Sequence, residues 1–329
     1  MQLNRHTRLP PALADIGPRE IRRVFPKPAL IEIAGERERP LFVSAMLHGN
    51  ETTSFHVLQA LARRYADARP PRSLQIFVGN VEAAEAGLRH LPGQPDFNRI
   101  WADGDSAHHR LVADVVAAAK AAEPIASIDI HNNSGANPYY GCVNALRPAD
   151  LHLAALFSDI GVYYRNPATT QSTAFSAFCP AVTVECGQSG ERDGIDQAIQ
   201  LVEDAMRLDG FPDHAPGASR QKLYETVGAV KVDPEASFSF GEPGSDIVFR
   251  GDLETLNFAE IEQGSVWAIS ARDPDSLRVV NEHGDILTGR FLEPRSGGLV
   301  LRQAITPAML TRDRAIIRDD CLCYFMRRL

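Results

Sequence analysis

Short apolar runs alternate with helix-like stretches between about Pro40 and Gly210, and this alternation restricts the fold more than any other feature. The runs read LFVSAM, LQIFVGN, SIDIH, YGCVNA and AVTVEC. The stretches between them span residues 52–68, 107–122, 148–161 and 194–208. In the first stretch Phe55, Leu58 and Leu61 recur at helical spacing. Nearly continuous apolar strands that alternate with amphipathic helices predict an α/β fold, with a sheet flanked by helices.

The pattern changes after GFPDHAPGASR, a stretch rich in Pro and Gly that indicates a domain boundary. Beyond it, short alternating segments such as LYETVGAVKV and SVWAIS are interrupted by Gly, Asp and Pro. Such segments are typical of β-structure. We therefore predict an α/β domain over residues 1–215 and a smaller β-rich domain over residues 216–329.

Composition argues against several classes of protein. The 34 basic and 42 acidic residues give a net charge of −8, which disfavours a nucleic-acid-binding surface. No segment approaches the roughly 18 consecutive apolar residues of a transmembrane helix, and the N-terminal segment lacks the apolar core of a signal peptide. The five cysteines form no Cys-x-x-Cys pair and indicate free thiols. We expect a cytoplasmic protein that binds neither nucleic acid nor membrane. Whether it forms a homo-oligomer stays open.

Polar side chains follow the predicted strands. In α/β sheets, ligands bind beyond the carboxyl ends of the strands. His48 and Glu51 come after LFVSAM, about one helical turn apart, and Gly49 allows a sharp turn between them. The run SIDIH places Asp129 and His131 on one face. Two imidazoles and one carboxylate can hold a catalytic zinc ion whose fourth position is open to water, with Asp129 orienting a ligand. The alternative is a helix N-terminus that favours Glu51, beside ordinary loop histidines.

Glu185 comes at the end of the valine-rich run AVTVEC, where a carboxylate is costly to bury without a partner or a task. If it faces a metal ion, it can act as general base for a water molecule and then protonate a leaving amine. A salt-bridged strand end is the alternative. Arg89, Asn98 and Arg99 lie in the loop GLRHLPGQPDFNRIW, and arginine can bind a carboxylate or stabilise an oxyanion.

Four motifs follow one another along the chain. They are Met-Leu-His48-Gly-Asn-Glu51, Asp96-Phe-Asn98-Arg99, Asp129-Ile-His131-Asn132 and Val184-Glu185-Cys-Gly187-Gln188. Taken in this order they resemble the aspartoacylase and succinylglutamate desuccinylase family of zinc hydrolases, which is related to the zinc carboxypeptidases. The similarity covers roughly residues 40–190. It implies a zinc carboxypeptidase-like fold, one zinc ion per chain on His48, Glu51 and His131, and Glu185 as the general base.

The resemblance also implies roles toward the substrate. Arg89 would polarise the scissile carbonyl group, while Asn98, Arg99 and Asn132 would hold the substrate. The β-rich domain over residues 216–329 would cap the active-site cleft and limit the length of the substrate.

One position departs from the family pattern. The family's amidohydrolases carry an arginine for the substrate carboxylate some ten residues before the catalytic glutamate. Gln171 stands in the comparable place here, and its neutral amide cannot form the same charge-assisted pair. Gln171 is therefore a predicted substrate residue of altered chemistry, and Arg165 is a nearby candidate to replace the missing arginine.

These observations together predict a zinc-dependent amidohydrolase or deacylase. It would cleave the amide bond of an N-acyl amino acid or a similar small molecule with a metal-activated water. One alternative is a metallocarboxypeptidase that acts on short peptides. Another is a non-catalytic binding module that kept the fold. The intact set of candidate ligands and the presence of Glu185 argue against such a module.

Overall fold

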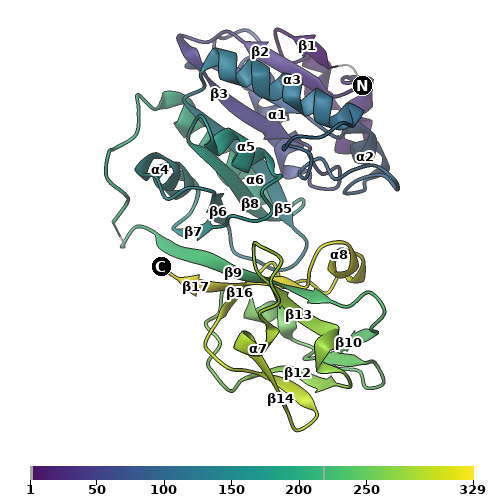
Figure 1. Ribbon diagram of the computed structural model, residues 1–329. Helices are drawn as coiled ribbons and strands as arrows, with labels where there is room; N and C mark the ends of the chain where they lie inside the picture. Colours follow the sequence, from purple (N-terminus) through teal and green to yellow (C-terminus); the bar gives the residue numbers. More distant parts are fainter. Residues whose placement is uncertain (1–2, 218) are drawn as a thin grey trace. The chain divides into compact units, whose positions relative to one another are not determined.

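The structure is a computed structural model that describes residues 3–217 and 219–329 (Figure 1). The first two residues of the N-terminal segment and one residue of the Pro/Gly-rich stretch lie outside the described residues. Contacts within the chain divide it into two units. The first comprises Met1–Asn132 and Tyr139–Lys222, and the second comprises Asn133–Pro138 and Leu223–Leu329.

A mixed sheet forms the centre of the first unit, as predicted. β3 runs parallel to β4 and β5, whereas β2 is antiparallel to β4 and β6 is antiparallel to β8. The parallel arrangement of β3 and β5 brings their carboxyl ends to the same edge of the sheet. In sheet order the strands are β1 (Asn4–His6), β2 (Ala29–Ile33), β4 (Arg72–Val78), β3 (Arg37–Ala45), β5 (Ala126–Asn133), β8 (Ala181–Gln188), β6 (Tyr140–Val143) and β7 (Ile160–Tyr163).

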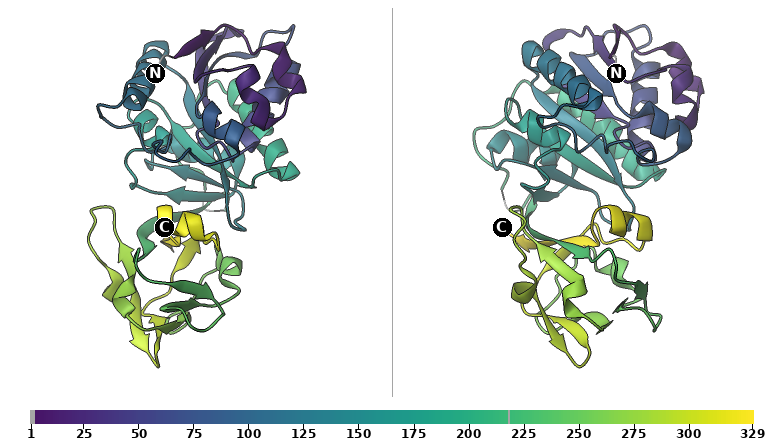
Figure 2. Two further views of the ribbon diagram at one scale, coloured as in Figure 1. Left: turned by 90° about the vertical axis from the view of Figure 1, so that its right-hand side faces the viewer. Right: turned by 45° about the vertical axis from the view of Figure 1, so that its right-hand side comes forward.

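Helices cover both faces of this sheet (Figures 1 and 2). Phe42 and Phe77 point into a core shared with α3 and α5, whereas Leu41 and Val43 are buried on the opposite face. On that other side α1 packs against α6, and α6 packs against α4. The helices are α1 (Thr53–Arg64), α2 (Val81–Ala86), α3 (Ala107–Ala122), α4 (Pro148–Phe157), α5 (Gln171–Ser176) and α6 (Arg192–Arg207), with short 3-10 turns η1 (Pro11–Asp15) and η2 (Pro18–Arg23).

The helix predicted over residues 148–161 is wrong at its C-terminal end. α4 ends at Phe157, and β7 begins at Ile160. The hydroxyl group of Ser158 accepts a hydrogen bond from Ile160 N, and Gly161 then pairs in parallel with Gly141 of β6. Sheet pairing therefore takes these residues out of the helix.

The second unit is rich in β-structure, as predicted. One sheet has the order β10-β11-β12-β15-β14, while β9 pairs with β13 and β17, and β17 pairs with β16. Trp267 and Phe325 meet edge to face in its core, with ring centroids 4.9 Å apart. Its elements are β9 (Lys222–Val232), β10 (Phe238–Phe240), β11 (Ile247–Phe249), η3 (Leu253–Leu256), β12 (Val266–Ala271), η4 (Pro274–Ser276), β13 (Leu277–Val280), α7 (Thr288–Phe291), β14 (Leu292–Arg295), β15 (Gly298–Leu301), β16 (Thr306–Ala308), α8 (Arg314–Asp319) and β17 (Cys323–Arg328).

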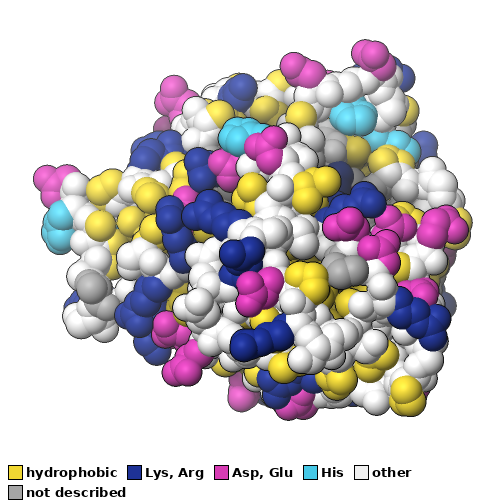
Figure 3. All heavy atoms as spheres, turned by 60° about the horizontal axis from the view of Figure 1, so that its bottom comes forward, with side chains coloured by type: hydrophobic (Ala, Val, Ile, Leu, Met, Phe, Trp, Pro, Cys, Tyr) yellow, Lys and Arg dark blue, Asp and Glu magenta, His cyan; other side chains and the backbone are white. Residues whose placement is uncertain are grey.

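The surface carries charges of both signs. Acidic and basic side chains are interspersed over the face shown in Figure 3. Within residues 3–217 and 219–329, none of the helices combines the length and the apolar character needed to cross a membrane.

Candidate metal centre

Two histidines and a glutamate converge at the carboxyl edge of the first unit's sheet. His48 and Glu51 lie in the turn between β3 and α1, and His131 lies near the end of β5. Glu51 Oε1 is 2.7 Å from His48 Nδ1, and Glu51 Oε2 is 2.8 Å from His131 Nδ1. The two Nδ1 atoms are 3.2 Å apart. All three side chains are buried, and one ligand atom from each lies within 4.8 Å of the others.

Each imidazole ring is held by a second carboxylate, on the nitrogen that does not contact Glu51. His48 Nε2 lies 2.9 Å from Asp96 Oδ1, and His131 Nε2 lies 2.8 Å from Asp129 Oδ2. The hydroxyl group of Ser44 donates to Asp129 Oδ1 over 2.6 Å, which fixes that carboxylate in turn. A carboxylate on Nε2 holds the proton on that nitrogen, so a metal ion can take the place of the proton on Nδ1.

Charges inside the cluster stabilise one another. Burial alone would raise the pKa of Glu51, but the imidazoles of His48 and His131 outweigh it and hold that pKa well below its usual range. Burial would lower the pKa of His131, but the carboxylates of Asp129 and Glu51 hold it well above its usual range. The pKa of Asp96 is lowered because His48 and Arg89 outweigh the effect of its burial.

The donor set fits a divalent cation. Two imidazole nitrogens and one carboxylate form the protein part of a catalytic zinc site, which keeps a position for water. The inward Nδ1 atoms, the buried carboxylate between them and the supporting aspartates all suit such an ion.

The turn that carries His48 and Glu51 passes close to α2. A Cβ atom on Gly49 would lie 2.2 Å from both Ala83 C and Ala84 N, which are backbone atoms. Close approach of two backbones is therefore the reason for glycine here.

We expect Gly49→Ala to displace the turn and with it His48 and Glu51. The variant should melt at a lower temperature than the parent chain and bind zinc at least tenfold more weakly, because both ligands move together. Thermal unfolding and a competition titration with a chelator measure the two effects. Gly210→Ala serves as a control for loss of a glycine in a loop, since its added Cβ would meet nothing within 4 Å and its φ lies outside the left-handed region. Unchanged zinc affinity in Gly49→Ala would show that the turn tolerates the methyl group.

Asn132 ties three elements together around the cluster. Its backbone N donates to Glu51 Oε2 over 3.0 Å, and its side-chain amide donates to Thr53 Oγ1 and to the carbonyl oxygen of Gly187. Its Oδ1 accepts from Thr53 N at the start of α1. The predicted substrate residue Asn132 thus lies beside the cluster, with its side chain bonded to the ends of α1 and β8.

Glu185 lies on β8, which is the neighbour of β5 in the sheet, and the strand continues to Gln188. Its side chain is buried. Burial raises the pKa of Glu185 to about 7, with His131 lowering and Glu51 raising the value. A carboxyl group with a pKa near neutrality can accept and return a proton at physiological pH.

Arg89 and Asn98 lie against the cluster of His48, Glu51 and His131. Arg89 Nη2 donates to Asp96 Oδ2 over 2.9 Å, and Arg89 Nη1 is 3.5 Å from Glu51 Oε1. Asn98 Nδ2 is 3.2 Å from His131 Nε2. Arg99 is half-buried, and its Nη1 donates to the carbonyl oxygen of Asn98. The loop that carries the predicted arginines therefore lies beside the cluster.

Gln171 occupies the first position of α5 with a fully buried side chain. Its amide nitrogen donates to Ser127 Oγ over 2.8 Å, and its backbone N donates to Asn98 Oδ1 over 2.9 Å. Arg165 follows β7, and its guanidinium lies 5.7 Å from the ring centroid of Tyr163. Gln171 thus connects to the cluster through Asn98.

Asp96 supports the cluster but was not a predicted site residue, because the motif that contains it assigns it no role of its own. It binds both His48 and Arg89. The signal that could have found it is its place two residues before Asn98, in a loop that also carries two arginines.

Comparison with known proteins agrees with this geometry. Residues 38–208 match the succinylglutamate desuccinylase/aspartoacylase catalytic domain. A succinylglutamate desuccinylase of Burkholderia lata is 36% identical over 90 residues, a stretch that makes up 27% of this chain and 24% of that protein. The aligned part thus spans about a quarter of the relative's length.

Solved structures share the fold. A succinylglutamate desuccinylase/aspartoacylase from Rhodobacter sphaeroides superposes with a TM-score of 0.60 at 14% identity, covering 91% of this chain and 88% of that chain. Murine aminoacylase 3 gives a TM-score of 0.56 at 11% identity, covering 90% and 97%. Since the match over residues 38–208 takes in more than half of the chain, the protein belongs to the succinylglutamate desuccinylase/aspartoacylase family.

Proposed function

We propose that the chain is a zinc-dependent hydrolase that cleaves the amide bond of an N-acyl amino acid or a similar small molecule. The proposal rests on one observation above all, the convergence of His48, Glu51 and His131 at a single buried point on the strand edge. Membership of a family of deacylases supports the type of reaction.

His48, Glu51 and His131 would hold one zinc ion per chain. A zinc ion at such a site lowers the pKa of water toward about 7 and polarises a carbonyl group. Asp96 and Asp129 keep both imidazoles in the tautomer that presents Nδ1. These contacts prepare the ligands before any metal ion or substrate arrives.

Glu185 would act as the general base. Its pKa of about 7 lets the carboxylate take a proton from the attacking water at neutral pH. The same group, now protonated, would deliver that proton to the amine as the amide bond breaks. Both transfers need only one buried carboxyl group beside the cluster.

Arg89 would stabilise the negative charge that develops on the carbonyl oxygen. Its pairing with Asp96 holds the guanidinium beside Glu51. Asn98 and Arg99 would bind the substrate. Because the side chain of Gln171 is buried on Ser127, we propose that Gln171 positions Asn98.

Metal analysis and a substrate screen test the proposal together. Purified protein is expected to contain about one zinc ion per chain and to release free amine from at least one N-acyl amino acid. Dipeptides that share the same C-terminal amino acid form the matched comparison, and preferential cleavage of those would favour a metallocarboxypeptidase. Full zinc content with no turnover of either class would indicate a binding module.

A further inference from the structure

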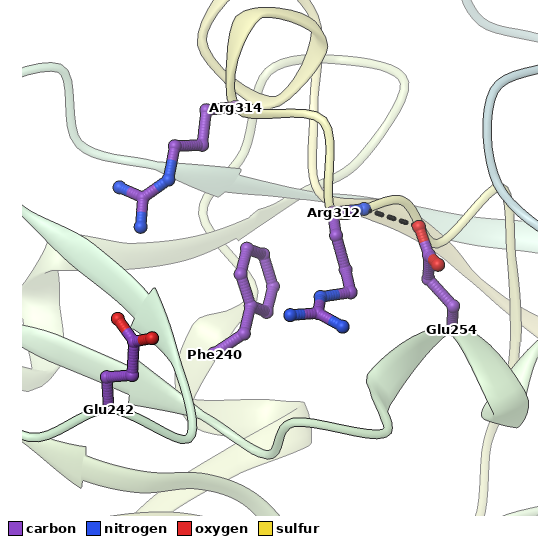
Figure 4. Close-up of a pocket in the computed structure, with 5 residues that line it drawn as sticks. All are labelled: Phe240, Glu242, Glu254, Arg312 and Arg314. Carbon is purple, nitrogen blue, oxygen red and sulfur yellow. Dashed lines mark hydrogen bonds between the residues drawn. The ribbon is translucent and has the colours of Figure 1, made fainter.

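A cavity of about 440 Å³ lies in the β-rich unit (Figure 4). This volume falls in the range of small-molecule sites. All of its lining residues belong to the second unit and none belongs to the metal cluster. The lining residues are Phe240, Glu242, Glu254, Arg312 and Arg314.

Two arginines flank an aromatic ring in this cavity. Figure 4 shows the ring of Phe240 between the guanidinium groups of Arg312 and Arg314. The guanidinium of Arg312 lies 5.3 Å from the ring centroid of Phe240. Arg314 lies 5.3 Å from the centroid of Phe238 and donates to the carbonyl oxygen of that residue. A guanidinium group stacked on an aromatic ring keeps its N–H donors at its edge, where they can bind a carboxylate.

Glu254 secures the segment that carries the arginines. Its Oε1 accepts a hydrogen bond from the backbone N of Arg312 over 2.6 Å. Glu254 lies in η3, whereas Arg312 comes just before α8, so the bond joins two distant parts of the unit. The position of Arg312 is therefore built into the fold of this unit.

Arg312 and Glu242 are two exposed lining residues of opposite charge, whose side chains lack a hydrogen-bonding or ion-pair partner among the described residues. Glu242 lies in the loop after β10, between Gly241 and Gly244, whose φ values of 85° and 113° suit glycine. Its backbone oxygen accepts from the hydroxyl group of Ser239, which fixes the loop.

We propose that this cavity binds a free amino acid. The carboxylate binds Arg312 and Arg314, and the ammonium group binds Glu242. Phe240 is 9% exposed and carries the guanidinium of Arg312 on its ring, so it supports that arginine. A ligand with only one of the two charges leaves either the arginines or Glu242 unmatched, whereas a zwitterion matches both. This site is independent of the proposed hydrolysis, because it uses none of the residues assigned to that reaction.

Calorimetric titration of the zinc-loaded full chain tests the site. The probes are L-leucine, 4-methylpentanoate, which lacks the amino group, and 3-methylbutylamine, which lacks the carboxylate. L-leucine is expected to bind at least tenfold more tightly than either analogue. Arg312→Gln and Glu242→Gln should each weaken L-leucine binding at least tenfold. Arg302→Gln changes an exposed arginine of the same unit outside the cavity and should leave binding unchanged.

Three results would overturn the proposal. The first is the absence of saturable binding of L-leucine, and the second is equal binding of either analogue. The third is L-leucine binding that survives Arg312→Gln but disappears in His131→Ala, because it would place the amino acid at the metal cluster. Zinc content and hydrolysis should be unaffected by Arg312→Gln, so failure of this site is distinguishable from failure of the proposed enzyme.

Discussion

His131→Ala is expected to purify with less than about a tenth of the zinc of the parent chain and to show no measurable hydrolysis. The substitution removes one of the three proposed ligands and leaves Glu51 beside a single imidazole. It also leaves the buried carboxylate of Asp129 without its imidazole partner at 2.8 Å, so metal affinity and local order fall together. His48→Ala should behave in the same way. Metal analysis after dialysis measures the zinc content.

Two further variants separate ligand loss from general disruption. Asp129→Asn keeps all three ligands but weakens the support of His131, so zinc affinity should fall by about 10- to 100-fold without being lost. His56→Ala removes a histidine of α1 whose ring bonds to Gln59, outside the cluster, and should keep full zinc content. Retention of zinc in both His48→Ala and His131→Ala would refute the site.

Strand periodicity made the pairing of Asp129 with His131 on β5 predictable. Alternate residues of a strand share a face, so SIDIH placed Asp129 and His131 together, and in the structure their side chains meet at 2.8 Å. The fold class followed from similar reasoning, since apolar runs between amphipathic helices favour a covered sheet. The end of α4 could not be predicted, because pairing of Gly161 with Gly141 depends on a neighbouring strand.

Contacts between residues far apart in the sequence could not be predicted from local patterns. Asp96 lies in a loop, and the residues around it do not indicate that it contacts His48, which is 48 residues away. Burial of Gln171 is similar, since its amide bonds from α5 to Ser127 on β5. Periodicity describes one element at a time, whereas these contacts arise only once the sheet brings several elements together.

Glu185→Gln is expected to keep its zinc but to lower kcat by about 10²- to 10⁴-fold. The amide has nearly the same shape as the carboxyl group but cannot accept a proton. In the parent enzyme kcat/KM should fall as the pH drops through the pKa of Glu185, because protonation removes the proposed base. A bound zinc ion would bring that pKa below its metal-free value of about 7. Glu203→Gln is the matched control, since Glu203 is another buried carboxylate. It is paired with Arg64 of α1 and Arg207 of α6, and it accepts a hydrogen bond from Tyr65, just after α1. That control should keep its turnover.

Glu185→Gln should also change the stability of the metal-free protein. The variant is expected to lose activity but to gain free energy of unfolding. The folded-state pKa of Glu185 is about 7, against an ordinary value of 4.5, so between these pH values the folded chain holds a proton that the unfolded chain has lost. Raising the pH through this window therefore lowers the free energy of unfolding, by up to about 3 kcal/mol. Glutamine carries no such charge, so metal-free Glu185→Gln should be more stable than the parent chain at pH 8 and similar to it at pH 5.

Urea unfolding of the metal-free chains at both pH values measures this difference. Glu203→Gln should be less stable than the parent chain at both, because the substitution breaks charged pairs at 2.9 Å and 3.0 Å instead of relieving a buried charge. A Glu185→Gln variant that loses activity and also loses stability at pH 8 would point to a structural carboxylate. Loss of activity together with a gain in stability is expected only of a base whose buried charge destabilises the folded state.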